Sequence, residues 1–433
     1  MNLILMLIPL FVILFLLIKK KHMLVAGLIG GVVAIAVSWI LVATGELETG
    51  LNFADINNLV VNVGIKDMLS KYLVPVIYAA GAVMIARSGS IKALIELLNR
   101  KLKGKLPWLA AAIVLVQALA TYMAGMGAGN TMVIAPLMFA AVGFIPEVVA
   151  AMAIATAIGF TTSPASTETG LAATAAGMEV GDFANMMLPV TIIVFLLAAA
   201  LAFYGVYRRK NVVRTDEQEE NELATKTNKQ LWSMVVPTIA FLILVVFGGK
   251  LNGLFPIPIF VPMVNVIIAA ILCVIFCKED SQKVSSNLID GSRFILTTLF
   301  GVGIFLGFIN MIGYLGTFAE LAGLIANAPE WIVIFLACLL AFVIAIPSGA
   351  FAAGVLTLIL PTLVLIPGLS PLAFGLIAIS VGLGTQISPV QINVAALSEG
   401  FKVSIFDVIK GNSKFILISA SAVGVFALIV GLL

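Results

Sequence analysis

Apolar runs long enough to cross a lipid bilayer recur from one end of this chain to the other. Residues 23–43 (MLVAGLIGGVVAIAVSWILVA) and 190–207 (VTIIVFLLAAALAFYGVY) contain no charged side chain. About 20 consecutive apolar residues span the hydrocarbon core as a helix, because a helix satisfies its own backbone hydrogen bonds without water. Hydrophobic residues make up 62% and charged residues 10%, against about 45–50% and about 25% in soluble domains. The sequence therefore predicts an all-α polytopic membrane protein with about 10 transmembrane helices.

A single aqueous segment, YRRKNVVRTDEQEENELATKTNKQ at residues 207–230, divides the chain almost in half. When the first half is shifted by 225 positions, AGNTMVIAP (128–136) falls on AGVLTLILP (353–361), and Ser163-Pro164 falls on Ser388-Pro389. Hydrophobic composition alone would not align the prolines. We therefore predict an internal repeat with copies at 1–206 and 231–433, joined by a linker at 207–230.

The distribution of Lys and Arg predicts the orientation of the chain. With the linker placed in the cytoplasm, all 24 Lys and Arg residues except Lys66, Lys71 and Lys250 fall in or beside inner loops, as the positive-inside rule requires. Both termini then lie outside a bacterial-type inner membrane. Lys19 to Lys21 follow the first apolar run rather than precede it, so we expect that run to be a retained helix rather than a signal peptide. Five crossings per half would make the repeat inverted, as in secondary transporters.

Two glycine-rich apexes, YMAGMGAGNTM (122–132) and IPSGAFAAGVL (346–356), each separate two apolar arms. They suggest a re-entrant hairpin in each half, because Asn130-Thr131 is too polar for a turn facing lipid. Two full crossings would also return the chain to the same side of the membrane. The distribution of Lys and Arg therefore does not distinguish two crossings from a re-entrant hairpin. Gly125 and Gly129 also have the GxxxG spacing of close helix packing.

The stretch IGFTTSPASTETGLAA (158–173) gathers hydroxyl side chains, a proline and a carboxylate inside an apolar region. The arms on either side, 147–160 and 171–180, are too short to span alone. Pro164 removes a backbone donor and disfavours helical geometry before it. GTQISPVQINVAAL (384–397) has the same character around Pro389. We predict a broken helix in each half, although a kink patched by Ser and Thr would look similar in one copy.

Broken helices bring half-helix ends to the middle of the membrane, where N–H groups suit an anion and C=O groups with hydroxyls suit Na⁺. The candidate substrate-binding residues are Gly129, Asn130, Thr131, Thr161, Thr162, Ser163, Ser166, Thr167, Ser348, Thr385, Gln386, Ser388, Gln391 and Asn393. No Lys or Arg is predicted at this depth.

Glu168 is the carboxylate predicted at that depth, and an intramembrane carboxylate is a functional candidate by default. It could take up a coupling proton, help coordinate Na⁺ together with Asn130 or Asn393, or only tune the potential of a water-filled vestibule. Na⁺ or H⁺ is the expected coupling ion, and no other cofactor or metal is expected. The three cysteines lie in apolar runs, where neither a disulfide framework nor a metal site fits them. His22 is the only histidine and lies in a basic loop, so the hydroxyl cluster has no histidine base and an enzyme is not expected.

These residues resemble a known family. A hairpin, a broken helix with Ser-Pro and an Asp-Phe before the next helix are similar to the ion transporter superfamily. Within it, SPASTETGLAATAAGMEVGDF (163–183) looks most like the anaerobic four-carbon dicarboxylate carriers of the DcuC type, whose acidic residue after the proline maps onto Glu168. The Asn130-Thr131 pair is similar to the hairpin signature of related dicarboxylate/sodium symporters, while the second copy has Val355-Leu356 there. The resemblance implies a scaffold domain, a moving transport domain and a homodimer.

We therefore expect a cation-coupled secondary transporter of small organic anions, with carboxylates as the favoured substrates and alternating access as the mechanism. Its partners would be an anionic small molecule, the lipid bilayer and a second copy of the chain, and no nucleic acid. The alternatives are a Na⁺/H⁺ antiporter using Glu168 without an organic substrate, and, with less support from the pattern, a channel. Carriers of gluconate, citrate and Na⁺/H⁺ share the layout, so the resemblance leaves the substrate open.

Overall fold

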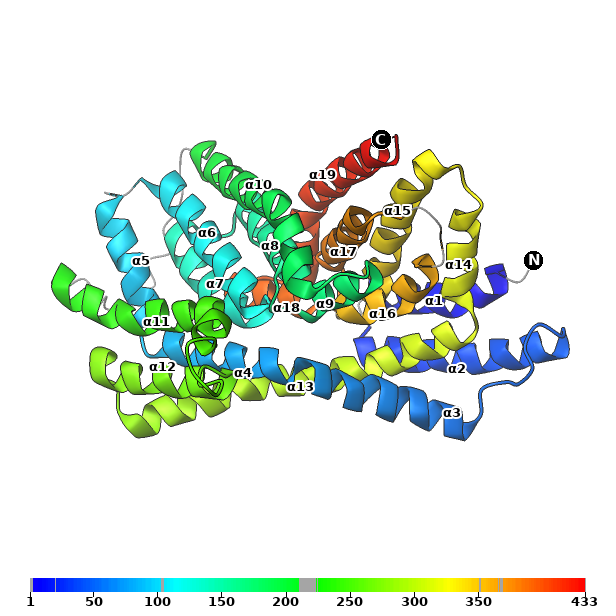
Figure 1. The fold of residues 1–433 in the computed structure, drawn as a ribbon, viewed down its shortest axis with the longest axis horizontal. Coiled ribbons are helices and arrows are strands. Elements are labelled where there is room, and N and C mark those ends of the chain that lie inside the picture. The colour runs from blue at the N-terminus through cyan, green and yellow to red at the C-terminus, as the bar shows by residue number, and fades with distance from the viewer. Residues whose placement is uncertain are drawn as a thin grey trace.

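The structure is a computed structural model that describes residues 3–19, 21–102, 105–209, 223, 225–349, 352–364, 366 and 369–432. Every regular element within these residues is a helix (Figure 1). The first half contains α1 (Leu3–Ile18), α2 (Met23–Ala43), α3 (Phe53–Asn57), the π-helix η1 (Asn58–Lys66), α4 (Asp67–Arg87), α5 (Ser90–Lys101), α6 (Leu106–Ala124), α7 (Ala128–Val142), α8 (Pro146–Thr162), α9 (Thr167–Ala175) and α10 (Val180–Tyr207). The second half contains α11 (Asn228–Asn252), α12 (Pro262–Cys277), α13 (Ser281–Tyr314), α14 (Thr317–Ala326), α15 (Glu330–Ser348), α16 (Ala352–Leu363), α17 (Pro371–Thr385), α18 (Ile392–Gly400) and α19 (Ile405–Leu432).

The helices of the two halves follow the same order from α6 and α15 onward. The bounds of α9 and α10 differ from those of α18 and α19 by 225 positions at both ends, and α8 and α17 begin 225 positions apart. The register predicted from the sequence therefore pairs helix with helix and break with break. The inversion of one copy relative to the other stays a prediction.

The apolar runs of the sequence predict helices at 72–88 and 294–311, and in the structure each is part of a longer helical segment. Helicity begins at Phe53, because Asn52 accepts from the N–H groups of Ala54 and Asp55 while the Asp55 carboxylate accepts from the N–H of Asn52. This capping box satisfies backbone groups that a helix start leaves open. The segment then continues through η1 into α4. The predicted helix at 294–311 is likewise longer, because α13 begins at Ser281 with Asp280 as its N-cap.

The helices form two layers, each built from both halves of the sequence (Figure 1). The lower layer in this view contains α2, α3, η1 and α4 together with α12 and α13, and α13 runs against both η1 and α4. The upper layer contains α6–α10 with α15–α19, where α8 packs on α17 and α7 packs on α18. Gly89 and Gly316 turn the chain from α4 into α5 and from α13 into α14 with φ of +82° and +81°, respectively.

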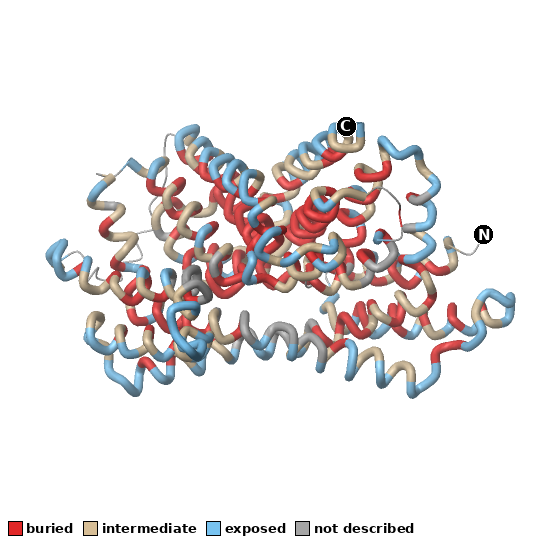
Figure 2. The backbone as a smooth tube through the Cα atoms, viewed as in Figure 1, coloured by how far each residue is buried: buried red, intermediate tan, exposed pale blue. Residues whose placement is uncertain are grey.

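Two helices at the centre of the upper layer have no exposed face. Every side chain from Glu147 to Thr162 in α8 and from Ala373 to Thr385 in α17 is buried, which Figure 2 shows as the red centre of the molecule. Neither helix has an amphipathic stripe, because neighbouring helices cover it on all sides. Small residues permit the close approach: a Cβ on Gly382 would lie 2.7 Å from the Thr161 methyl.

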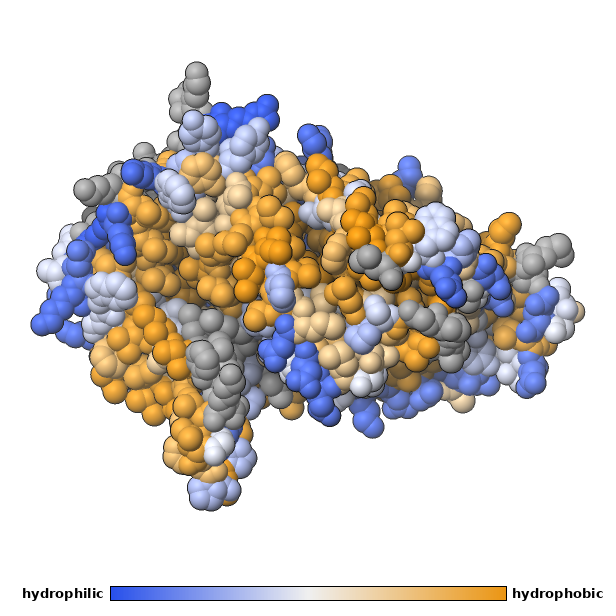
Figure 3. Space-filling view, turned by 45° about the horizontal axis from the view of Figure 1, so that its top comes forward, coloured by the Kyte–Doolittle hydropathy of each residue, from blue (hydrophilic) through white to orange (hydrophobic). Residues whose placement is uncertain are grey.

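The outer surface is largely apolar. Figure 3 shows hydrophobic residues over much of one face, with hydrophilic residues mainly toward its margins. Large apolar side chains are exposed on α1 and α10, including Phe11, Phe15, Ile192, Leu196 and Leu197. In the described residues four helices (α2, α10, α15 and α19) are long and apolar enough to cross a membrane by themselves, or up to six if each of two bent helix pairs counts as one span. The total of about 10 crossings stays a prediction.

Glycines set the contact between η1 and α13. A Cβ on Gly64 would lie 2.5 Å from the carbonyl oxygen of Gly303 and 3.1 Å from the Cα of Gly307. Backbone meets backbone there, so no flexible side chain can move aside. The two segments can only pack this closely without side chains at the crossing.

We predict that Gly64→Ala separates η1 from α13 and destabilises the protein by about 1–3 kcal/mol, the usual cost of overpacking. Gly323→Ala is the matched control, because a Cβ there would meet nothing within 4 Å. The measurement is the monodisperse fraction on size-exclusion chromatography after heating in detergent. Equal heat resistance of the two variants would contradict the close contact.

Candidate functional site

The break between α8 and α9 is shorter than the sequence predicts. Only residues 163–166 leave the helix, while Thr161 and Thr162 form the last turn of α8 and Thr167 begins α9. Ser163 is extended at φ −73° and ψ 134°, as expected before Pro164. Its hydroxyl accepts from the N–H of Ala165 at 3.0 Å and donates to the carbonyl of Tyr122 in α6. The chain bends by 51° between the two helices.

The first hairpin consists of α6 and α7, and its tip at residues 125–127 lies against this break. α6 ends at Ala124, and its C-cap Gly125, with φ of +65°, turns the chain toward α7. A Cβ on Gly125 would lie 2.3 Å from the carbonyl oxygen of Ala165 and 2.8 Å from the amide nitrogen of Ser166. The tip and the break therefore touch backbone to backbone. Gly127, two residues on, lies against the side-chain methyl group of Thr156 in α8.

The second break lies between α17 and α18 and satisfies its backbone by short turns. The N–H groups of Gln386, Ser388 and Gln391 donate to the carbonyls of Leu383, Thr385 and Ser388. The hydroxyl of Ser388 accepts from the N–H of Val390 at 3.4 Å. Gln391 is the N-cap of α18, and its side chain accepts from the N–H of Asn393. Backbone that has left a helix at this depth is tolerated because protein surrounds it.

A pocket opens where the hairpins and breaks meet. Its empty space, including the part open to solvent, is about 450 Å³. Its walls are Gly125, Met126, Gly127, Ala128, Phe160, Glu168, Ala352, Gln391, Ile392 and Asn393. None of these ten residues is Lys or Arg.

The first residues of four helices lie at this pocket or next to it. Ala128 begins α7, Ala352 begins α16 and Ile392 begins α18, while Glu168 is the second residue of α9. Helix N-termini carry partial positive charge and N–H groups without intrahelical partners. Their convergence favours an anion even without a basic side chain. Glu168, only 4% exposed, is the one carboxylate among the walls.

A buried network of neutral side chains stands behind one wall of the pocket. Thr131 Oγ1 donates to Asn393 Oδ1 at 2.6 Å, and Asn393 Nδ2 donates to Gln386 Oε1 at 2.6 Å. Gln117 Nε2 of α6 donates to Thr131 Oγ1 at 2.5 Å and to Thr156 Oγ1 at 3.1 Å. These bonds join the first hairpin to the second break across the two halves of the sequence.

The predicted site residues thus divide into groups. Glu168, Gln391 and Asn393 line the pocket, whereas Thr131, Thr385 and Gln386 are buried and do not line it. Thr161 and Thr162 donate to the carbonyls of Ala157 and Ile158 within α8. The remaining predicted residues lie nearby: Gly129 is buried in the first turn of α7, Ser163, Pro164 and Ser166 form the first break, Thr167 begins α9, and Ser388 and Pro389 lie in the second break. The side chain of Ser348 lies outside the described part of the chain.

Asn130 turns away from the other predicted residues. Its Nδ2 donates to the carbonyl of Met126 at 3.3 Å. The residue lines a separate, mostly apolar cavity among α4, α5, α6, α7 and α11, together with Ile85, Phe241 and others. The structure therefore does not bring Asn130 and Asn393 to one pocket.

Sequence reasoning missed Gln117 and Thr156 of the network, and Phe160 and Ala352 of the pocket wall. The first two lie in apolar runs with no nearby motif. The repeat carried a signal for them: at the same register the second half has Phe342 and Val381. Where a polar residue of one copy aligns with an apolar residue of the other, the two copies differ in role.

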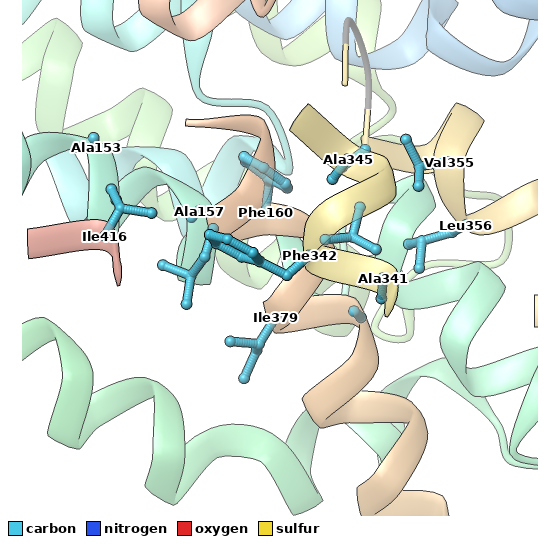
Figure 4. Packing of buried hydrophobic residues seen from close by; sticks show 14 of the residues in the cluster. Ala153, Ala157, Phe160, Ala341, Phe342, Ala345, Val355, Leu356, Ile379 and Ile416 are labelled. Atoms are coloured by element: carbon cyan, nitrogen blue, oxygen red, sulfur yellow. The ribbon is translucent and has the colours of Figure 1, made fainter. Parts of the chain in front are cut away.

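The corresponding place in the second half is apolar. Figure 4 shows Phe342 and Ala345 of α15 and Val355 and Leu356 of α16 gathered with Phe160 of α8. Leu356 occupies the repeat position of Thr131 and cannot hydrogen-bond. In the described residues the second hairpin therefore contributes apolar contacts here, and the polar network belongs to the first hairpin.

Comparison with solved structures finds the same architecture in another protein. The YdaH transporter of Alcanivorax borkumensis, described as having an unusual topology, matches with a TM-score of 0.55 at 16% sequence identity. The match covers 94% of this chain and 98% of that one. At this identity the likeness establishes a shared fold and nothing finer. A comparison with curated protein sequences returned no significant match.

The family follows from the sequence profile that matches residues 3–432, described as the DcuC C4-dicarboxylate anaerobic carriers. This chain belongs to the DcuC family. The resemblance seen in residues 163–183 is thereby confirmed, as is the all-helical membrane fold. The protein is a multi-pass membrane carrier of the C4-dicarboxylate class, and both the family and the solved neighbour consist of transporters rather than enzymes.

We predict that Gly125→Ala destabilises the protein and lowers transport, because it adds a methyl group where the hairpin tip meets the backbone of Ala165. Gly177→Ala is the matched control: its φ is +66°, like the +65° of Gly125, but nothing lies within 4 Å. Both changes add the left-handed strain of about 1–2 kcal/mol. Only Gly125→Ala adds the clash with Ala165. A difference between the two variants in thermal stability and uptake therefore measures the effect of that clash. Indistinguishable variants would contradict the contact.

Proposed function

We propose that this protein moves a C4-dicarboxylate across the bacterial inner membrane by cation-coupled alternating access, with the substrate bound in the pocket at the two breaks. The observation that carries the proposal is the convergence of four helix N-termini on walls that contain no Lys or Arg. Such termini hold carboxylates through N–H groups and partial charge. Asn393 and Gln391 add neutral polar groups at the same pocket.

The charge of the site supports coupling to a cation, either H⁺ or Na⁺. A doubly charged substrate beside the Glu168 carboxylate would place negative charges together at low dielectric, which is strongly unfavourable. A proton on Glu168, or a Na⁺ ion near it, would remove this repulsion. Substrate and cation would then enter together. Glu168 is therefore our candidate for the coupling residue.

The moving part would be α6–α10 with α15–α19, and the fixed part α1–α4 with α11–α13. Three features support this division: α8 and α17 pack on each other, the Gln117 to Gln386 network joins the two halves, and α5 and α14 connect the layers. The cytoplasmic placement of residues 207–230, the outer placement of both termini, the inverted repeat and the homodimer are parts of the same proposal.

The proposal is tested by reconstituting the protein in liposomes and measuring labelled succinate uptake with an imposed Na⁺ or H⁺ gradient. We expect saturable uptake that one gradient drives and that fumarate and malate inhibit. Uptake without saturation or gradient dependence would indicate a channel. Cation exchange that no carboxylate affects would indicate an antiporter, and the proposed function would be wrong.

We predict that Glu168→Gln abolishes the accumulation of succinate against its gradient, because the amide cannot exchange a proton or neutralise Na⁺. Binding of succinate should persist, since the amide removes a negative charge from the pocket. Glu399→Gln is the control, because Glu399 is an exposed carboxylate on α18 outside the pocket walls. Gradient-driven accumulation that survives unchanged in Glu168→Gln would rule out this coupling role.

A further inference from the structure

A chain of hydrogen bonds runs from a backbone carbonyl in α17 to a side chain in α6. Thr385 Oγ1 donates to the carbonyl of Gly382 at 2.7 Å, and Gln386 Nε2 donates to Thr385 Oγ1 at 3.3 Å. The chain continues through Gln386 to Asn393, then to Thr131, and ends at Gln117. All five side chains are at least 97% buried.

The donor and acceptor in each of these hydrogen bonds are determined at the α17 end of the series. A backbone carbonyl can only accept, so the Thr385 hydroxyl gives its hydrogen to Gly382 and can only accept from Gln386. Gln386 must then turn its NH₂ toward Thr385 and its oxygen toward Asn393. This requires the NH₂ of Asn393 to face Gln386 and its oxygen to face Thr131, whose hydroxyl donates. The assignment of both amides thus follows from the network.

The other end of the chain does not impose a direction. Gln117 Oε1 is buried without a hydrogen-bond partner in the described residues. Turning the Gln117 amide over would exchange one unpartnered group for another. The carbonyl of Gly382, acting through Thr385, is therefore the anchor that orients Asn393.

Asn393 is the member of this chain that reaches the pocket. It lines the walls, whereas Thr385, Gln386, Thr131 and Gln117 do not. An amide NH₂ has two hydrogens, and one of those on Asn393 goes to Gln386. The second has no partner among the described residues. It is the hydrogen-bond donor that the side chain of Asn393 has left for a ligand.

We infer that Thr385 and Gln386 are positioning residues that hold Asn393 with an N–H, rather than its oxygen, toward the substrate carboxylate. This inference rests on the proposed function, because it assigns the donor that recognises the anion at that pocket. The matching positions of the repeat carry different residue types: Phe160, Thr161 and Glu168 stand at the positions of Thr385, Gln386 and Asn393, and Phe342 and Leu356 stand at those of Gln117 and Thr131. The two breaks therefore present opposite hydrogen-bonding character, a donor at Asn393 and a carboxylate at Glu168.

The test is Thr385→Val, which keeps the shape but removes the hydroxyl and so frees the two amides to turn over. Uptake of succinate and of its half-amide, succinamate, is measured in proteoliposomes. We expect the succinate KM to rise about tenfold, as for a lost hydrogen bond to a charged group, with little change in maximal rate. The preference for succinate over succinamate should fall, because an Asn393 oxygen facing the pocket accepts from an amide N–H. Thr385→Ser restores the hydroxyl and should restore both values.

An unchanged succinate KM in Thr385→Val, or equal KM increases for both ligands, would overturn the inference. If Thr385→Val does not fold, Gln386→Met tests the same point one step along the hydrogen-bond chain. It removes the oxygen that holds the NH₂ of Asn393, so Asn393 can turn over and the preference for succinate should fall. Gln117→Met is the control, because it leaves the anchor at Gly382 and the link through Gln386 in place and should keep the preference. The same loss of preference in Gln386→Met and Gln117→Met would show a merely structural role.

Failure of the proposed function gives a different result. In that case the wild-type protein neither binds nor transports succinate, and the inference falls with it. Where the wild-type protein shows saturable succinate uptake and the preference does not move in the variants, the inference alone is wrong.

Discussion

The need of every buried backbone group for a hydrogen-bond partner governs this structure. Within a bilayer a helix meets that need by itself, and a break does not. The breaks after Thr162 and Thr385 exist because other parts of the protein close around them. Ser163 serves the first break by bonding to Ala165 and Tyr122, and short turns serve the second. The polar side chains of these breaks, such as Ser163, Ser166 and Ser388, are consequently buried although they interrupt apolar runs.

Enclosure of the breaks depends on close backbone approach. The hairpin tip at Gly125 meets the carbonyl of Ala165, and Gly382 of α17 meets Thr161 of α8. These contacts have no room for side chains, so the position of the tip is defined by sterics rather than by a particular bond. The pocket is what remains between such contacts. Its chemistry comes from helix starts, whose N–H groups are the polar groups left over.

Periodicity and the internal repeat predicted most of the fold. Apolar run length indicated the helices, Ser-Pro in both copies indicated the breaks, and the 225-position register located α18 and α19 from α9 and α10. The long segment α3–η1–α4 was missed because Asn52, Asp55 and their neighbours look like a loop until the capping box and the packing on α13 are known. The sequence predicted where the site lies but not which residues contact one another. It does not show that Thr161 bonds within its own helix, that Asn130 lines another cavity, or that Gln117 reaches Thr131. These contacts depend on the rotation of each helix about its axis and on how closely the helices pack.

The two glycine corners at Gly89 and Gly316 have a mechanical consequence. Each lies between a long helix of the lower layer, α4 or α13, and the short helix, α5 or α14, that leads to a hairpin. Packed cores such as α8 against α17 resist deformation, whereas a glycine in the left-handed region can change its torsions at little cost. If the layers shift as proposed, the displacement is carried by two pivots, one in each half of the sequence. The displacement then falls on the backbone torsions of these two glycines, and the pocket can travel without changing shape.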